Sequence, residues 1–247
     1  MRSTDINNFL KEYIAEPTSG SLLIDGEWGI GKTYFINDFV KEFEKEQNNF
    51  KIIKISLFGI TSIEELSNKI NTSLLTKIGK VVDTGKNLLG ELFESKLGID
   101  ISIIDFGSLL SATNKDKNKT YKCILIFDDL ERCSIDIKEI LGYINNLNEN
   151  YEQKVVVIAN VAELKDREAN FRTYKEKVFS FIFNFEPDFE NSALNILKTK
   201  FSGFSVLQGH QDDIVATFQS KKHTNLRTVI NLSNKINRLV PKPYKKC

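Results

Sequence analysis

Two runs of consecutive apolar residues limit the folds open to this chain more than any other feature. They are CILIF at residues 123–127 and VVVIA at residues 155–159, and neither alternates apolar with polar residues. A strand that is apolar throughout is buried on both faces, which is typical of a parallel sheet covered by helices on both sides. The two runs therefore predict an α/β fold.

Three further runs, at residues 21–25, 51–58 and 178–185, are also predicted to be strands. Apolar residues at helical spacing lie between the strands: Phe35, Phe39 and Phe43; Ile63, Leu66, Ile70 and Leu74; Ile137, Ile140, Ile144 and Leu147. Alternating strands and helices favour parallel pairing with right-handed crossovers. We predict a doubly wound, parallel, five-stranded sheet within residues 1–186, with an insertion of unassigned structure at residues 79–120.

The pattern becomes wholly helical after Pro187. Two apolar stripes have helical spacing: Phe189, Ala193, Ile196 and Leu197; Leu226, Val229, Ile230, Ser233 and Ile236. Residues 187–247 are therefore predicted to form a small α-helical subdomain.

Residues 26–33, GEWGIGKT, match the phosphate-binding pattern G-x-x-x-x-G-K-[ST] between the first strand and a helix that begins near Tyr34. Glycines let consecutive backbone N–H groups turn toward phosphates, and the helix N-terminus adds partial positive charge. The predicted nucleotide-binding residues are Gly26, Glu27, Trp28, Gly29, Ile30, Gly31, Lys32, Thr33 and Tyr34. The motif predicts binding of a nucleoside triphosphate with Mg²⁺; we expect ATP, although no motif distinguishes ATP from GTP.

Each polar residue of this region has an expected role. Lys32 would reach the β- and γ-phosphates, and the Thr33 hydroxyl would bind Mg²⁺. The strand at 123–127 ends in Asp128 and Asp129, at the sheet edge where ligands bind in this architecture. Asp128 would hold Mg²⁺, chiefly through water, and Asp129 would orient or deprotonate the attacking water. A pair of aspartates after a strand is also compatible with a turn or a helix cap.

Two further residues are candidates for catalysis. Asn160 ends the fourth strand, where its amide would bind the γ-phosphate or the attacking water, although asparagine also suits a strand-to-loop turn. Arg227 begins a helix of the C-terminal subdomain and would fold back onto the phosphates, which would couple nucleotide state to the position of that subdomain. The alternative for Arg227 is an exposed helix arginine.

Taken together, GEWGIGKT, DDLERC at residues 128–133 and NLRT at residues 225–228 resemble the motifs of the KAP P-loop ATPases, a branch of the AAA+/STAND regulatory ATPases. Two positions differ: Glu131 stands where that family usually has aspartate, and Leu226 replaces an expected proline. The resemblance implies that residues 187–247 are a lid and that Arg132 is either structural or directed at the γ-phosphate. It also implies a neighbouring subunit's arginine in the site, for which Arg167 and Arg172 are candidates.

Composition limits the partners. The 34 Lys and Arg nearly balance the 33 Asp and Glu, so nucleic acid is not expected as the main partner. The basic C-terminus could still touch it locally, through Lys221, Lys222, Lys235, Arg238, Lys242, Lys245 and Lys246.

The longest stretch without a charge, residues 201–211, is too short to span a bilayer, and the insertion carries regularly spaced charges. Three cysteines with no secretory leader ahead of them favour free thiols and a cytoplasmic location. The two histidines, His210 and His223, lack ligand-spaced partners, so we expect no zinc site. Cys133 is expected to pack rather than react.

The sequence thus predicts a Mg²⁺-dependent ATPase switch that acts on an effector protein or within a homo-oligomer. The resemblance suggests bacterial antiphage defence or signalling as the setting. Two alternatives stay open: a nucleotide-binding scaffold that does not hydrolyse, and a P-loop kinase of small molecules.

Overall fold

The computed structural model describes residues 3–16, 20–47, 50–77, 122–186, 188–221 and 224–239. The whole of the predicted insertion (residues 79–120), together with Pro187, His223 and the last eight residues, lies outside these ranges. Five parallel strands form one sheet in the order β2-β3-β4-β1-β5. The strands are β1 (Ser21–Asp25), β2 (Phe50–Ser56), β3 (Lys122–Asp128), β4 (Lys154–Ala159) and β5 (Phe179–Asn184). The predicted fold class is confirmed.

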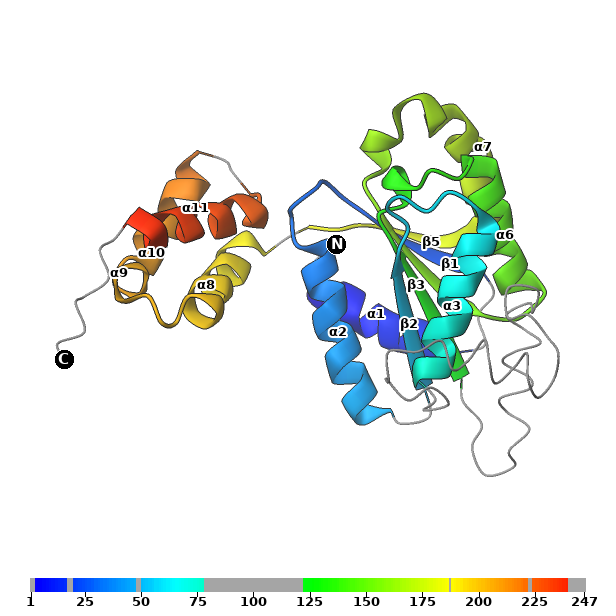
Figure 1. The fold of residues 1–247 in the computed structure, drawn as a ribbon, viewed down its shortest axis with the longest axis horizontal. Helices are drawn as coiled ribbons and strands as arrows, with labels where there is room; N and C mark the ends of the chain where they lie inside the picture. The colour runs from blue at the N-terminus through cyan, green and yellow to red at the C-terminus, as the bar shows by residue number, and fades with distance from the viewer. Residues whose placement is uncertain are drawn as a thin grey trace.

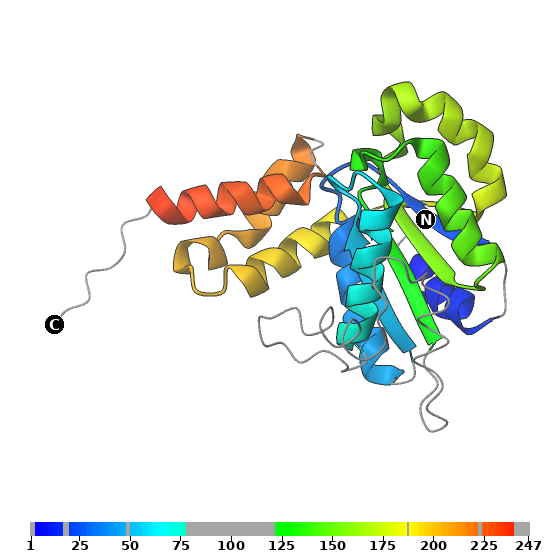
Figure 2. The same cartoon turned by 45° about the vertical axis from the view of Figure 1, so that its right-hand side comes forward.

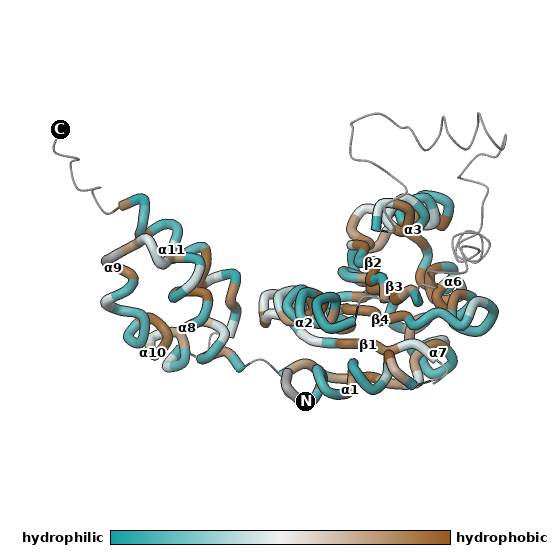
Figure 3. Tube along the Cα trace, turned by 90° about the horizontal axis from the view of Figure 1, so that it is seen from below, coloured by the Kyte–Doolittle hydropathy of each residue, from teal (hydrophilic) through white to brown (hydrophobic). Residues whose placement is uncertain are grey.

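Helices cover both faces of the sheet (Figures 1 and 2). The helices of this part are α1 (Ser3–Ala15), α2 (Lys32–Glu46), α3 (Ile63–Lys77), α6 (Ile137–Glu149) and α7 (Glu168–Val178). One core cluster joins α3, α6 and α7 to one face, and a second joins α1 and α2 to the other. In β3, Leu125 and Phe127 belong to the first cluster, whereas Ile124 and Ile126 belong to the second. This two-sided burial explains the uninterrupted apolar run of β3, and the central strands are correspondingly brown in Figure 3.

Two 3₁₀ segments follow two inner strands of the sheet. They are η2 (Leu130–Arg132), after β3, and η3 (Val161–Arg167), after β4. The strand predicted at 51–58 ends at Ser56: the Leu57 N–H makes the last bond to β3, at the Asp128 carbonyl, and the chain then turns at Gly59, whose φ is 75°. Phe58 is left 65% exposed at this turn.

The C-terminal helices have an apolar core of their own. They are α8 (Phe189–Lys200), α9 (Ser205–Gln208), α10 (Gln211–Ser220) and α11 (Leu226–Leu239). Phe189, Leu197, Phe201 and Val229 are among its buried members, and the views show these helices as a separate bundle beside α2. Among the described residues, no helix is both long and apolar enough to cross a membrane.

Helix α1 was not predicted, although Ile6, Leu10, Tyr13 and Ile14 have helical spacing. All four are buried against the α2 face of the sheet. The Tyr13 hydroxyl lies 3.2 Å from the Val155 carbonyl and accepts a 3.3 Å hydrogen bond from the Val155 N–H. Burial raises the pKa of Tyr13 well above its ordinary value. Tyr13 therefore fastens α1 to an inner strand.

Removing this hydroxyl tests whether α1 is part of the cooperative fold. We expect Tyr13→Phe to lower the free energy of unfolding by about 1–2 kcal/mol, because the Val155 N–H loses a buried acceptor. Urea denaturation measures the change. Tyr174→Phe, at a tyrosine that is 39% exposed, is the matched control. Equal stability of the two variants would contradict the anchoring role of the Tyr13 hydroxyl.

Candidate functional site

The loop between β1 and α2 depends on two glycines in the left-handed region. Gly29 has a φ of 79° and Gly31 a φ of 106°, values that other residues rarely adopt. The Gly26 N–H donates a 3.1 Å hydrogen bond to the carbonyl of Ala159 at the end of β4, which fixes the loop to the sheet. Gly31 is the residue before α2, so the loop runs directly into the N-terminus of a helix.

Lys32 points back into this loop. Its side chain is largely buried, and Nζ donates to the carbonyls of Gly26 and Glu27, the latter at 2.8 Å. Burial lowers the pKa of Lys32, and the nearby carboxylates, with Glu131 and Asp25 foremost, oppose that shift. Since its partners are backbone carbonyls, the ammonium is free to exchange them for phosphate oxygens.

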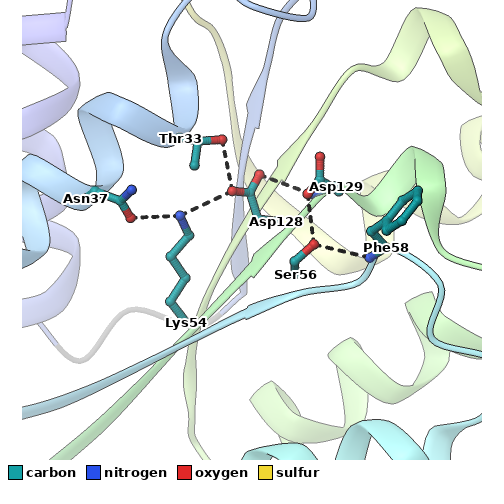
Figure 4. A network of polar contacts seen from close by, with 7 residues as sticks. All are labelled: Thr33, Asn37, Lys54, Ser56, Phe58, Asp128 and Asp129. Carbon is teal, nitrogen blue, oxygen red and sulfur yellow. Dashed lines mark hydrogen bonds and ion pairs between the residues drawn. The ribbon is translucent and has the colours of Figure 1, made fainter.

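The end of β3 brings a carboxylate to the first turn of α2 (Figure 4). The Thr33 hydroxyl donates a 3.0 Å hydrogen bond to Oδ2 of Asp128, which is 4% exposed. A hydroxyl and a carboxylate side by side are oxygen ligands of the kind that Mg²⁺ binds. Within the described ranges, no three His, Cys, Asp or Glu side chains are grouped as metal ligands. Mg²⁺ commonly takes one or two protein oxygens and its other ligands from phosphate and water, and the Thr33–Asp128 pair fits such a cation.

Two further residues of this network come from β2, and the sequence analysis overlooked both. The Ser56 hydroxyl donates a 2.8 Å hydrogen bond to Oδ2 of Asp129, and Nζ of Lys54 lies 3.2 Å from Oδ2 of Asp128 (Figure 4). Ser56 is level with Asp128 in the parallel register. Both residues stand near the carboxyl end of a predicted strand, and the carboxyl ends of parallel strands meet at one edge of a sheet. This position points to the site only when the strand order is known, because that order places β2 beside β3.

A second network joins the loop to the segment after β3. The Glu131 carboxylate accepts from the Trp28 indole N–H through Oε1 and from the Asn160 backbone N–H at 3.0 Å through Oε2. The Arg132 guanidinium lies 4.5 Å from the Trp28 ring centroid, at cation–π distance. This placement favours the structural role of the two expected for Arg132.

The C-terminal helices are attached to the phosphate loop itself. The Leu226 N–H donates to the Gly29 carbonyl at 2.7 Å, and the Asn225 amide donates to the Trp28 carbonyl at 3.2 Å. The Asn225 oxygen also accepts from the backbone N–H groups of Arg227 and Thr228, which caps α11. A Cβ at Gly29 would lie 2.2 Å from Oδ1 of Asn225, so this contact requires glycine as much as the φ angle does.

A cavity of about 390 Å³ lies between the sheet edge and the C-terminal helices. Its polar wall includes Lys32, Thr33, Asp128 and Asp129, and its opposite wall is supplied by Ile196, Leu226, Arg227 and Ile230, together with neighbouring residues. Charged groups on both walls suit the phosphates of a nucleotide, and the apolar side chains of the second wall suit its base. Arg227 lines this cavity, and its expected contact with the phosphates stays a prediction.

Asn160 is brought close, but its side chain is not among the residues that line this cavity. It is 6% exposed and contributes its backbone N–H to the Glu131 bridge. The amide role expected for Asn160 stays a prediction.

The remaining sequence candidates lie away from the cavity. The Arg167 guanidinium donates to the carbonyls of Cys133 and Ile135 at 2.7 and 2.9 Å, so it braces its own chain. Arg172 forms an exposed ion pair with Glu168, and it is the more accessible of the two arginines expected to reach a neighbour. Burial raises the pKa of the Cys133 thiol, which agrees with a packing role.

The chain is similar to known proteins in sequence and in fold. The KAP family P-loop domain model matches residues 3–96, which confirms the resemblance expected from the motifs. The human cell division control protein 6 homolog is 21% identical over 203 residues, covering 81% of this chain and 32% of that protein.

Solved structures share the fold. The structure of Drosophila ORC bound to DNA superposes with a TM-score of 0.56 at 15% identity, over 96% of this chain and 54% of that chain. The Walker-type ATPase of Pyrococcus abyssi superposes with a TM-score of 0.53 at 12% identity, over 94% of this chain and 71% of that chain. The chain therefore spans about a third of the curated relative and about half of the ORC chain.

Two substitutions of Asn225 distinguish its hydrogen bond to the Trp28 carbonyl from its capping of α11. Asn225→Ser keeps an oxygen that caps α11 but loses the amide N–H that donates to the Trp28 carbonyl, which we expect the shorter hydroxyl not to reach, whereas Asn225→Ala loses both contacts. Trp28 is the only tryptophan, so its fluorescence reports the loop contact. We expect both variants to change Trp28 emission, and only Asn225→Ala to destabilise α11, by about 1 kcal/mol in amide hydrogen exchange.

Asn234→Ser, an exposed change on the same helix, is the control. Wild-type emission from Asn225→Ser would show that the Asn225 donor does not hold the C-terminal helices to the loop.

Proposed function

We propose that this chain, a P-loop NTPase with a KAP family P-loop domain, binds ATP with Mg²⁺ and hydrolyses it as a conformational switch. One observation carries the proposal: Lys32, Thr33, Asp128 and Asp129 line one wall of a cavity whose other wall includes Arg227. The family and the shared fold support nucleotide binding and hydrolysis in general. Mg²⁺ dependence and the switch are the finer parts of the proposal.

Each side chain has a distinct task in this scheme. Lys32 leaves the carbonyls of Gly26 and Glu27 to neutralise phosphate oxygens. Thr33 and Asp128 hold Mg²⁺, which when bound supplies positive charge to the phosphates.

Asp129 is the proposed base. Its Oδ2 accepts from Ser56, which orients the carboxylate and leaves Oδ1 to accept a proton from an attacking water. Arg227 approaches the phosphates from the opposite wall, and its guanidinium can bind two phosphate oxygens through a pair of N–H groups.

The switch follows from the attachment of α11 to the phosphate loop. Trp28 and Gly29 provide the carbonyls that hold Asn225 and Leu226. A nucleotide that rearranges this loop therefore changes the contacts of the C-terminal helices, which makes those helices a lid. The ligand shifts the lid only as far as it binds one arrangement more tightly than the other.

The partner and the biological setting are proposed from the resemblance to the KAP P-loop ATPases. An effector protein or a second copy of the chain would respond to the lid, and bacterial antiphage defence or signalling is the proposed setting. DNA contact is a further possibility, because one similar structure is that of Drosophila ORC bound to DNA and α11 exposes Lys235 and Arg238. Binding that weakens with salt and with charge reversal at these two residues would support it.

Steady-state phosphate release from Mg·ATP, measured over a range of protein concentrations, tests the function. We expect Asp129→Asn to bind ATP but to lower kcat by about 10²–10⁴-fold, since the proton acceptor is lost. Lys32→Ala should weaken ATP binding by about 10–100-fold, because a charge-assisted hydrogen bond to phosphate is lost. Lys41→Ala, at an exposed lysine of the same helix, is the control.

Other outcomes identify the alternatives. A wild type that binds Mg·ATP but turns over no faster than Lys32→Ala would be a nucleotide-binding scaffold. Faster phosphate transfer to an added metabolite than to water would indicate a kinase. Turnover that rises with protein concentration would point to sites shared between copies.

A further inference from the structure

Lys54 places a cation against the buried carboxylate of Asp128. Its Nζ lies 3.2 Å from Oδ2, the same oxygen that accepts from Thr33 at 3.0 Å (Figure 4). The Asp128 side chain is 6% exposed and that of Lys54 is 22% exposed. A buried carboxylate is costly unless it is paired, and Lys54 provides the pairing charge.

This position conflicts with a bound Mg²⁺. Thr33 and Asp128 are the residues proposed to hold the metal, so an ammonium on the Oδ2 atom of Asp128 competes with it for the same oxygen. Two cations on one buried carboxylate also repel each other strongly in a medium of low dielectric constant. Lys54 and Mg²⁺ are therefore expected to compete for Asp128, so that only one of the two binds it at a time.

We propose that Lys54 is a place-holding cation, which pairs with Asp128 in the metal-free protein and sets the Mg²⁺ concentration at which the nucleotide site is completed. This inference rests on the proposed function. Lys54 is a positioning residue in this role, because it acts on the metal through Asp128.

The structure gives Lys54 a second acceptor. Part of Lys54 lines a wide groove of about 720 Å³ between β2 and α3, but its Nζ lies on the α2 face of β2 and donates to Oδ1 of Asn37 at 2.8 Å. Asn37 can therefore keep the ammonium when Mg²⁺ takes the carboxylate.

The two lysines of the site are expected to respond in opposite ways. Lys32 bonds to loop carbonyls and is proposed to bind phosphate, so its removal weakens nucleotide binding. Lys54 bonds to the proposed metal ligand, so its removal strengthens Mg²⁺ binding. A general loss of positive charge would not produce opposite signs.

The test is a MgCl₂ titration of the full chain at a fixed concentration of a non-hydrolysable ATP analogue, followed by Trp28 fluorescence and by thermal melting. We expect Lys54→Gln and Lys54→Met to lower the half-saturating Mg²⁺ concentration by about tenfold, because the competing charge is gone. Lys54→Arg, which keeps the charge, should stay near wild type. Lys69→Gln removes a charge from an exposed ion pair beside the same groove and is the control.

A second readout is the melting temperature without metal, compared with that in MgCl₂ and the analogue. In EDTA, Lys54→Met should melt below wild type, since Asp128 has lost its cation, and MgCl₂ with the analogue should narrow the difference. If neither neutral variant folds, Asn37→Asp offers an exposed substitution that draws the Lys54 ammonium from Asp128 and should lower the Mg²⁺ requirement in the same direction.

The outcomes separate the two proposals. A wild type with no Mg²⁺-dependent binding of the analogue would overturn the proposed function, and the role of Lys54 with it. A wild type that binds, with neutral variants that need the same or more Mg²⁺, would overturn the role of Lys54 alone.

Discussion

The buried carboxylate of Asp128 is the group on which the site depends. It ends an inner strand and is 4% exposed, so its charge must be balanced by neighbours. Thr33 reaches it from the phosphate loop helix, and Lys54 reaches it from the edge strand β2. One oxygen therefore holds three elements of the sheet edge together, and the position of the loop relative to β3 follows from that balance of charge.

A second constraint is steric and lies at Gly29. Its carbonyl and that of Trp28 hold the start of α11, and a side chain at Gly29 would overlap Asn225. The same glycine that allows the loop to turn toward phosphate also allows the C-terminal helices to approach it. In the proposed function, phosphate binding and the position of the C-terminal helices are therefore linked through one short stretch of backbone, and no long relay of side chains is needed.

The sequence predicted what depends on local pattern. The five strands, the loop at Gly26–Thr33 and the placement of Asp128 all follow from apolar runs and from one motif. Helix α1 was overlooked because no motif drew attention to it, although its apolar spacing was present. Lys54, Ser56 and the Glu131 bridge could not be predicted, because these contacts join residues far apart in the chain and require the strand order and register.

The charges of the site are paired in the structure, so the protein does not need nucleotide to be stable. Lys32 is bonded to its own loop and Lys54 to Asp128, so each cation already has a partner in the structure. In the proposed function, nucleotide and metal therefore replace hydrogen bonds and an ion pair that the protein already makes. That exchange reduces the net affinity, because each new contact is offset by one that is broken. It also makes binding depend on rearrangement at the loop and at β2, which is the condition for a switch.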